Sequence, residues 1–319
     1  MDRRHFLKTS SAIAVAWGLG NNIQADTEET SQKFRGHYST ENIKASAEDL
    51  SLRFLGTGAA GYYQDNTRRR HSSVLLDRKI LIDLNKCGLD MLPSKCHPEV
   101  LFYTHSHIDH YEPETALNLG VKKIYLSETW IEKAQKDFQK YSEQNNKPMP
   151  QLIPLSVGQK IEEGGLVFTA LPANHATGSY KEQALIYLIE KGTTEEKLGV
   201  RLLYATDTGG IMGIASRIAG IDPHLKVGRP ITAFIMEATI GMGMNEDWRM
   251  FNHSSVEGVA RTVHMLEQQG RYIPLAGQPA YITHMSKKGW PTQEELDKTL
   301  PLPLRAAYDG LDVVFKSRS

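Results

Sequence analysis

The order of apolar and polar residues predicts many short strands with a few helices between them. Short apolar runs that end at Gly, Asp or Asn are typical of strands, whereas apolar residues at every third or fourth position indicate helices. The predicted strands are residues 51–55, 72–76, 80–84, 100–104, 161–171 with a turn at Gly164 and Gly165, 184–189, 201–205, 231–237, 280–283 and 311–315. The predicted helices are residues 127–144 and 255–269, with one helical turn at 293–298. This order favours a layered α/β protein in which polar residues at strand ends gather at one edge.

Residues 1–25 have the pattern of a targeting signal rather than of part of a globular fold. Arg3 and Arg4 precede Phe-Leu-Lys, an Ala-rich apolar run covers residues 11–19, and Ala25 follows as a cleavage candidate. The apolar run is shorter than the ~20 residues that cross a bilayer. The segment resembles a twin-arginine export signal, which predicts a periplasmic protein; an amphipathic basic helix is the alternative. Residues 26–50 are polar and are predicted to be a tether, so the domain covers residues 51–319.

Charge and cysteine content limit the partners that the chain can have. Lys and Arg number 37 and Asp and Glu also number 37, which argues against a nucleic-acid-binding surface because phosphate binding relies on a basic excess. The only two cysteines, Cys87 and Cys96, cannot build a disulfide framework; one disulfide and two free thiols both stay open. We therefore expect a small-molecule substrate, no nucleic acid and no membrane association after removal of the signal, and a homodimer stays open.

The densest chemical signal is the segment Thr104-His105-Ser106-His107-Ile108-Asp109-His110, which directly follows a predicted strand. Zinc prefers imidazole nitrogen and accepts carboxylate oxygen. On an extended stretch His105 and His107 point to the same side, and a turn at Asp109 can direct Asp109 and His110 toward a second ion. The alternative is a polar loop with scattered histidines.

Three later strand ends supply further ligand candidates, namely His175, Asp207 and His284. Each one alone is more typical of a cap or a hydrogen-bonded surface group. Together with the histidine-rich segment they complete a set for two cations. The predicted ligands of one ion are His105, His107 and His175, those of the other are Asp109, His110 and His284, and Asp207 lies between them.

This ordered set of ligands resembles that of the metallo-β-lactamase superfamily, over about residues 51–319. Leu55-Gly56-Thr57-Gly58 resembles the opening turn of the family, Ile80-Leu81-Ile82-Asp83 its aspartate-bearing strand, and Ala307-Tyr308-Asp309-Gly310-Leu311 an ending common in one branch. The resemblance implies a single domain with a four-layer αβ/βα sandwich and the metals at one edge.

Within the superfamily, the chain is most similar to the branch that contains tRNA 3′-processing endonucleases (RNase Z) and the cyclic phosphodiesterase of phosphonate degradation. Phe251-Asn252-His253-Ser254 resembles the segment that carries the proton donor of the phosphodiesterase, and Arg69-Arg70-His71-Ser72-Ser73 resembles an Arg-x-x-Ser stretch near the active site of that branch. The cysteine cluster of the phosphodiesterase and the basic arm of the endonucleases are missing. These departures weaken the analogy with the cyclic phosphodiesterase and argue against tRNA as a substrate.

The predicted chemistry is metal-assisted hydrolysis. Two divalent ions, with Zn expected first and Mn, Fe or Co also suited to these ligands, lower the pKa of a bridging water. Asp109 and Asp207 hold the ions, and His253 is the candidate general acid, with a buried or capping histidine as the alternative. Asp83 and Glu237 are expected to orient other site residues through hydrogen bonds rather than to bind metal themselves.

Two sequence features are candidates for substrate contacts. Arg69 and Arg70, together with Arg68, are predicted to bind an anionic substrate, with a solvated loop as the alternative. Residues 241–244 with Trp248 could form an apolar wall beside the substrate, or merely fill gaps.

The leading hypothesis is thus an exported dinuclear hydrolase of a small phosphodiester, with cyclic phosphodiesters among the candidates. The same ligands also suit a lactone, ester or amide hydrolase. Two hypotheses from other classes are an iron redox protein on this fold and a non-catalytic protein that binds a structural metal.

Overall fold

The computed structural model describes residues 46–60, 69–244, 246–275, 277–286, 290 and 292–317. The chain divides into two units, Met1–Ser39 and Thr40–Ser319, and every described residue belongs to the second. The predicted export signal, residues 26–45 of the predicted tether and Arg68 lie outside the described residues.

The first sheet has seven strands in the order β14-β1-β2-β3-β4-β5-β6. Their bounds are Leu50–Gly56 (β1), Ser73–Leu76 (β2), Ile80–Ile82 (β3), Val100–Phe102 (β4), Lys123–Ser127 (β5), Gln151–Leu155 (β6) and Asp312–Phe315 (β14). Strands β3 to β6 run parallel, and β1 pairs antiparallel with β2 and β14. Between β2 and β3, Asp77 and Arg78 both have positive φ, as a type I′ hairpin turn requires, so the predicted hairpin is present.

The second sheet also has seven strands, in the order β13-β12-β11-β10-β9-β8-β7. Their bounds are Lys160–Glu163 (β7), Leu166–Pro172 (β8), Leu185–Lys191 (β9), Val200–Ala205 (β10), Ala233–Glu237 (β11), Ala280–Thr283 (β12) and Leu304–Ala306 (β13). Strands β7 to β10 pair antiparallel, and β10 to β13 run parallel. Gly164 and Gly165, with φ of 60° and 82°, make the turn between β7 and β8 that the sequence predicts.

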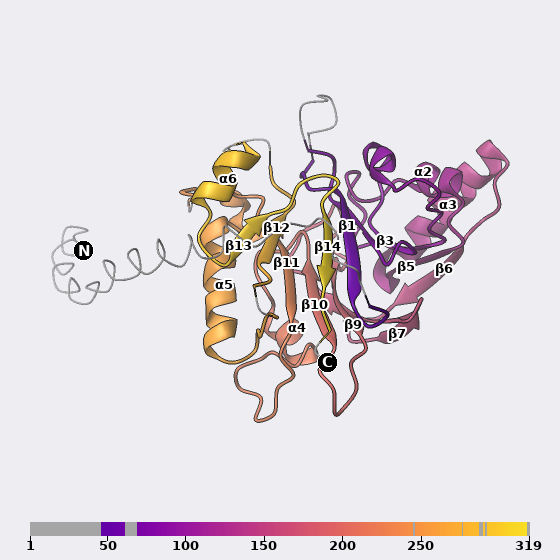
Figure 1. Ribbon diagram of the computed structural model, residues 1–319. Coiled ribbons are helices and arrows are strands. Elements are labelled where there is room, and N and C mark those ends of the chain that lie inside the picture. Colours follow the sequence, from indigo (N-terminus) through magenta and orange to yellow (C-terminus); the bar gives the residue numbers. More distant parts are fainter. Residues whose placement is uncertain are drawn as a thin grey trace, which may run out of the picture. The chain divides into compact units, whose positions relative to one another are not determined.

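Helices cover the outer face of each sheet (Figure 1). Their bounds are Pro113–Leu119 (α2), Ile131–Asn145 (α3), Gly213–Ile218 (α4), Val256–Gln268 (α5) and Gln293–Thr299 (α6), with 3₁₀ turns at Lys86–Met91 (η1), Glu128–Trp130 (η2) and Trp248–Phe251 (η3). One apolar core lies between the sheets, a second joins the second sheet to α4, α5 and α6, and a third joins the first sheet to α2 and α3. These layers confirm the predicted four-layer α/β sandwich.

Helices α5 and α6 begin after residues that cap them, whereas Ser127 caps η2 and α3 begins at Ile131 without a side-chain cap. The Ser255 side chain accepts a hydrogen bond from Gly258 N at 3.1 Å, and Thr292 and Glu295 form a capping box at the start of α6. The sequence pattern does not predict β5, β6, β13, α2 or α4. Strand β6 contains Pro154, which a strand at the edge of a sheet accommodates because it has a neighbour on one side only.

The described residues show the state of the two cysteines and the character of the helices. Cys87 and Cys96 are both free thiols, so the disulfide alternative is not realised. Among the described helices, none combines the length and apolar character that a membrane span needs.

Candidate metal centre

The candidate site residues follow strands that end at one edge of the two sheets. His105 to His110 follow β4, His175 follows β8, Asp207 follows β10 and His284 follows β12. Strands β3 and β4 run parallel, as do β10, β11 and β12, and parallel strands present their carboxyl ends at the same edge. The topology therefore gathers side chains that are up to 180 residues apart in the sequence, and it brings all seven predicted ligands together.

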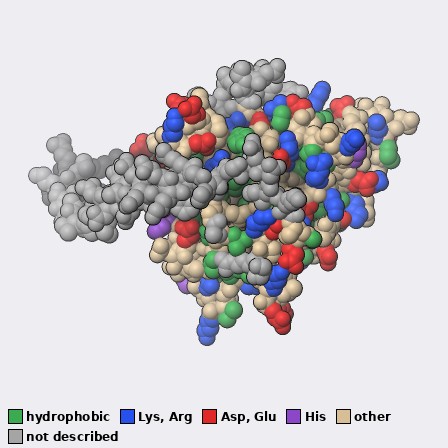
Figure 2. All heavy atoms as spheres, viewed as in Figure 1, with side chains coloured by type: hydrophobic (Ala, Val, Ile, Leu, Met, Phe, Trp, Pro, Cys, Tyr) green, Lys and Arg blue, Asp and Glu red, His purple; other side chains and the backbone are tan. Residues whose placement is uncertain are grey.

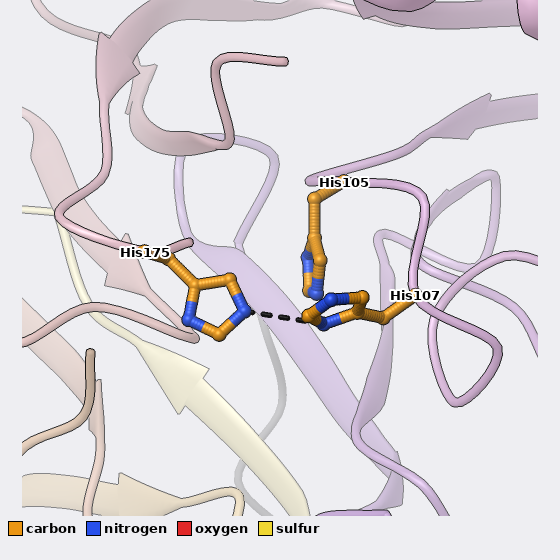
Figure 3. Close-up of side chains that lie close together, drawn as sticks. All are labelled: His105, His107 and His175. Atoms are coloured by element: carbon orange, nitrogen blue, oxygen red, sulfur yellow. Dashed lines mark hydrogen bonds between the residues drawn. The ribbon is translucent and has the colours of Figure 1, made fainter. Parts of the chain in front are cut away.

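The first group, here called the histidine cluster, consists of His105, His107 and His175. One nitrogen from each ring lies within 4.8 Å of the others. His107 Nδ1 and His175 Nε2 are 3.2 Å apart, and the three rings converge in Figure 3. His105 is fully buried, the His175 side chain is only 3% exposed, and His107 is half-buried. Three imidazoles that converge at this spacing can hold one divalent ion.

The second group, here called the aspartate cluster, consists of Asp109, His110 and His284, all of which are buried. His110 Nε2 lies 3.1 Å from His284 Nε2, and both nitrogens are within 3.5 Å of Asp109 Oδ2. Two imidazoles and a carboxylate are a second set of ligands suited to a divalent ion.

Asp207 lies between the two clusters. Its Oδ2 is 2.7 Å from His110 Nε2, 3.1 Å from His284 Nε2 and 3.9 Å from His105 Nε2. Its Oδ1 is 4.0 Å from His175 Nε2. One carboxylate thus faces nitrogens of both clusters, which is the position expected of a residue that bridges two ions.

Strained backbone directs several of these side chains inward. Asp83, Asp207 and His284 have φ of 56°, 47° and 52°, in the left-handed region that non-glycine residues rarely adopt. Each such residue costs about 1 kcal/mol or more, and such residues concentrate at functional sites. All three follow a strand, so the change of backbone direction occurs where the side chain must leave the sheet.

Asp83 holds two residues of the histidine-rich segment in place. Its carboxylate accepts hydrogen bonds from Thr104 N at 2.8 Å and Thr104 Oγ1 at 2.9 Å, and lies 2.8 Å from His110 Nδ1. Because the Thr104 hydroxyl donates to Asp83, it accepts from His105 Nδ1 at 3.0 Å. His105 Nε2 is then left buried without a hydrogen-bond partner and facing the cluster. A buried acceptor nitrogen that needs a partner fits a cation there.

Thr239 and Glu237 act in the same way behind His284. Thr239 Oγ1 is 2.8 Å from His284 Nδ1 and donates to Glu237 Oε2 at 2.5 Å. Glu237 Oε1 is 3.0 Å from His253 Nδ1, and His253 Nδ1 is also 3.3 Å from Asp207 Oδ1. Sequence reasoning missed Thr239, whose only signal is a hydroxyl two residues after a strand-ending carboxylate. His253 and Glu237 also form a group with His284 whose ligand atoms are within 4.8 Å.

Burial and charge set the protonation of the two clusters differently. Burial lowers the pKa of His105, His107 and His175, which keeps these imidazoles neutral, as metal ligands must be. Burial also lowers the pKa of His110, but Asp109, Asp207 and Asp83 outweigh it and the net pKa is raised. A metal ion bound in the aspartate cluster would therefore release a proton from His110.

Asp109 and Asp207 stay ionised, and His253 holds a proton. Burial raises the pKa of Asp109 and of Asp207, but the neighbouring histidines, His110 above all for Asp109 and His284 for Asp207, outweigh burial and lower it. For His253, burial lowers the pKa, but Glu237 and then Asp207 raise it to about 9. His253 is thus cationic near neutral pH.

Glu182 is a further residue that sequence reasoning missed. Ser106 lies between His105 and His107, and both its backbone N and its Oγ donate to Glu182, each at 2.7 Å. Glu182 comes from the loop between β8 and β9, so this contact ties the histidine-rich segment to the other sheet. No local sequence pattern indicates the contact, because 76 residues separate the two partners.

Arg69 and Arg70 have protein partners in this structure. Arg69 donates to Thr57 Oγ1 at 2.9 Å, to Ala307 O at 2.7 Å and to Gln293 Oε1 at 2.9 Å. Arg70 Nε donates to Asp90 at 2.8 Å, and Arg70 Nη1 lies 3.6 Å from Asp309. These contacts hold Arg69 and Arg70 in place ahead of β2. A role in substrate binding stays a prediction, and it would require exchange of these partners.

More than half of the chain matches a known protein family. The family model described as "Beta-lactamase superfamily domain" matches residues 89–275, more than half of the chain. The matched range contains every predicted metal ligand except His284. No curated protein matches the chain.

Several solved structures share the fold. A diphosphatase from the PhnP family is 20% identical, with 85% of this chain and 99% of that chain covered and a TM-score of 0.58. Zn²⁺-bound PqqB from Methylobacterium extorquens is 14% identical, with 82% and 99% covered and a TM-score of 0.59. A long form of RNase Z from yeast is 15% identical, with 87% of this chain and 43% of that chain covered and a TM-score of 0.57. At these identities the likeness concerns the fold.

Proposed function

Because the chain belongs to the beta-lactamase superfamily, we propose that it is a dinuclear metal hydrolase that acts on a small phosphodiester. Family membership and the His/Asp clusters already indicate a metal-dependent hydrolase. The observation that carries the dinuclear proposal is Asp207, whose two carboxylate oxygens face nitrogens of both clusters.

The proposed ligands are the seven residues predicted from the sequence. The histidine cluster would hold one ion, the aspartate cluster the other, and Asp207 would contact both. Divalent ions bound there would lower the pKa of water and stabilise negative charge that develops on the substrate. Zinc suits these nitrogen and oxygen ligands, and so do manganese and iron.

His253 is proposed to donate the proton to the leaving group. Its Nδ1 is held by Glu237 at 3.0 Å, so the proton for transfer would be on Nε2. A pKa of about 9 keeps that proton in place near neutral pH. When the bond between phosphorus and the leaving oxygen breaks, the imidazolium can protonate the alkoxide that departs.

The phosphodiester class is supported by two observations. The segment 251–254 resembles the proton-donor segment of a phosphodiesterase branch, and its histidine lies 3.3 Å from Asp207. Two proteins with the same fold are described as a diphosphatase and as an RNase Z. These observations favour membership in that branch and a phosphorus centre over a carbonyl centre.

A substrate screen tests the proposal. The purified chain would be loaded with Zn²⁺ or Mn²⁺ and assayed with bis(p-nitrophenyl) phosphate, a 2′,3′-cyclic nucleotide and a homoserine lactone. We expect turnover of a phosphodiester that disappears with chelator and returns with metal. Turnover of the lactone alone would reject the phosphodiester and leave a carbonyl hydrolase. A predominance of iron together with redox activity would instead indicate a redox protein.

We also propose that the protein is exported to the periplasm and acts there on a small molecule, without binding nucleic acid or membrane. Support comes from Arg3-Arg4 and the apolar run behind them, and from the equal numbers of basic and acidic residues. On the face shown in Figure 2, basic and acidic side chains are interspersed. Replacement of both arginines by lysine should keep the chain in the cytoplasm, as measured by cell fractionation; unchanged export would contradict a twin-arginine signal.

A further inference from the structure

Large apolar side chains are exposed around the candidate metal centre. Among the described residues, the exposed fractions are 79% for Ile108, 94% for Tyr180, 74% for Trp248, 53% for Met250 and 77% for Phe251. Ile108 lies between His107 and Asp109, Tyr180 follows His175 by five residues, and the other three lie within the five residues before His253. We call these five residues the apolar rim.

Hydrogen bonds hold the three segments of the apolar rim together. Glu182, two residues after Tyr180, accepts from Ser106, which lies two residues before Ile108. Asn252, next to Phe251, accepts at its Oδ1 from Ala176 N at 3.1 Å and lies with its carbonyl 3.2 Å from His175 Nδ1. A residue spans at most ~3.6 Å of chain, so these connections keep the rim segments within a few residue lengths of the clusters.

The charged groups in these segments have partners of their own. The Arg249 guanidinium bonds to Asp247 at 2.6 Å, and Glu182 is engaged by Ser106. Lys181 Nζ lies 5.9 Å from the centre of the Tyr180 ring. Arg69 and Arg70 are bonded to other protein groups, as described above. The rim therefore offers apolar contact area rather than ion pairing to a molecule that enters the site.

Exposed apolar side chains in segments that adjoin a candidate site favour an occupant with apolar groups. Single exposed apolar residues are common on proteins, but several together mark a binding surface, because covering them removes apolar area from water. The position of this surface beside the clusters distinguishes it from exposed apolar residues elsewhere, such as Val227 in the loop between α4 and β11.

We propose that the substrate has an aromatic or aliphatic group attached next to the reacting centre and that this group packs against the apolar rim. The inference rests on the proposed function for the site itself, and it specifies the substrate class: an ester with a bulky apolar or aromatic substituent rather than a polyanion. Trp248 and Phe251 are the specificity-determining residues, because aromatic rings provide the largest contact area.

Binding of matched anions tests this inference without turnover. Calorimetry on the Zn²⁺-loaded chain would compare phenylphosphonate with methylphosphonate, and phenylacetate with acetate. We expect the phenyl compound of a pair to bind about tenfold more tightly, because half or more of a phenyl ring would be covered. In the double variant Trp248→Ala, Phe251→Ala the preference should fall below about threefold, and in the control Val227→Ala it should stay at the wild-type value.

The outcomes separate the two proposals. A phenyl preference among the phosphonates supports both. Equal, measurable affinity for the two phosphonates overturns the apolar rim as a substrate contact and leaves the phosphodiester proposal intact. A phenyl preference among the carboxylates with no phosphonate binding supports the rim and overturns the phosphodiester. Sedimentation supplies the last outcome: a wild-type dimer that becomes a monomer in the double variant would assign the rim to a contact between two copies and overturn the proposal.

Discussion

The two clusters of the candidate centre differ in burial, charge and support. The aspartate cluster is fully buried, contains a carboxylate, and has Asp83 behind one histidine and the Thr239–Glu237 pair behind the other. The histidine cluster is neutral, has the half-buried His107, and is supported by the Asn252 carbonyl and by the Thr104 hydroxyl, which itself donates to Asp83. Among the described residues, only the aspartate cluster has a ring nitrogen in direct contact with a supporting carboxylate, that of Asp83 on His110, and such a contact orients the ring and increases its basicity more than a neutral acceptor does. We therefore expect the aspartate cluster to bind its ion more tightly and the histidine cluster to lose its ion first.

The largest effect is expected for Asp207, because it faces both clusters. In Asp207→Asn the carboxylate charge is lost while the shape is kept. We expect hydrolysis to fall by about a thousandfold or more and the bound metal to fall below two ions per chain. Metal analysis after gel filtration and kcat/KM for the best phosphodiester are the measurements. The matched control is Asp222→Asn. Asp222 is a buried carboxylate in the loop after α4 and bonds Arg217 of that helix, so this variant should keep both the bound metal and kcat/KM.

His253 lies beside both clusters. Its Nδ1 is 3.3 Å from Asp207 Oδ1, and the centre of its ring is 5.0 Å from that of His175. His253→Ala should lower hydrolysis about a hundredfold for an alkyl leaving group and much less for p-nitrophenolate, which departs without a proton. Glu237 and then Asp207 raise the pKa of His253, and two bound cations would lower it again, so kcat/KM in the wild type should decline as pH rises through the pKa of His253 in the metal-loaded enzyme. The variant should lack this decline. A loss of bound metal in the variant would show instead that His253 is a ligand.

Asp83 tests the support of the aspartate cluster. Asp83→Asn keeps the side-chain volume but removes the charge beside His110 Nδ1. We expect the affinity for the more tightly held ion to fall about 10-fold to 100-fold, with a smaller change at the histidine cluster. Chelator competition, read as two separate steps of metal release, is the measurement. If the two steps moved together, the clusters would not be independent in the way proposed here.

The sequence predicted the centre better than its surroundings, for a physical reason. His105, His175, Asp207 and His284 each follow a buried strand, and the pairing of those strands leaves few directions for the next side chain. The apolar runs predicted a layered α/β protein for the same reason, and the family resemblance added the four layers. The long Arg69 side chain is not constrained in that way; it donates to Thr57, 12 residues away in the sequence, and to Ala307 and Gln293, which are 238 and 224 residues away.

The supporting residues were harder to predict because they depend on tertiary contacts alone. Asp83 and Glu237 end apolar strands, so a polar residue there attracts notice. Thr239 and Glu182 lie in ordinary loop sequence, and only the packing of one sheet on the other brings Glu182 to Ser106. Short elements such as α4, and the edge strand β6 with its proline, were missed because the periodic pattern is too brief or is interrupted.

Glu182 gives the smallest expected effect and the sharpest comparison with Asp83. Its carboxylate bonds the Ser106 backbone and hydroxyl from outside, and contacts no ring nitrogen. Because Ser106 lies between His105 and His107, loss of these bonds should loosen the histidine cluster and leave the aspartate cluster unchanged. In Glu182→Gln one acceptor is retained, so we expect metal affinity at the weaker site to fall by about tenfold or less. Glu182→Ala should have a larger effect in the same direction. The first step of metal release should therefore move in the Glu182 variants and the second in Asp83→Asn; the opposite assignment would mean that the histidine cluster, despite its greater exposure, holds the tighter ion.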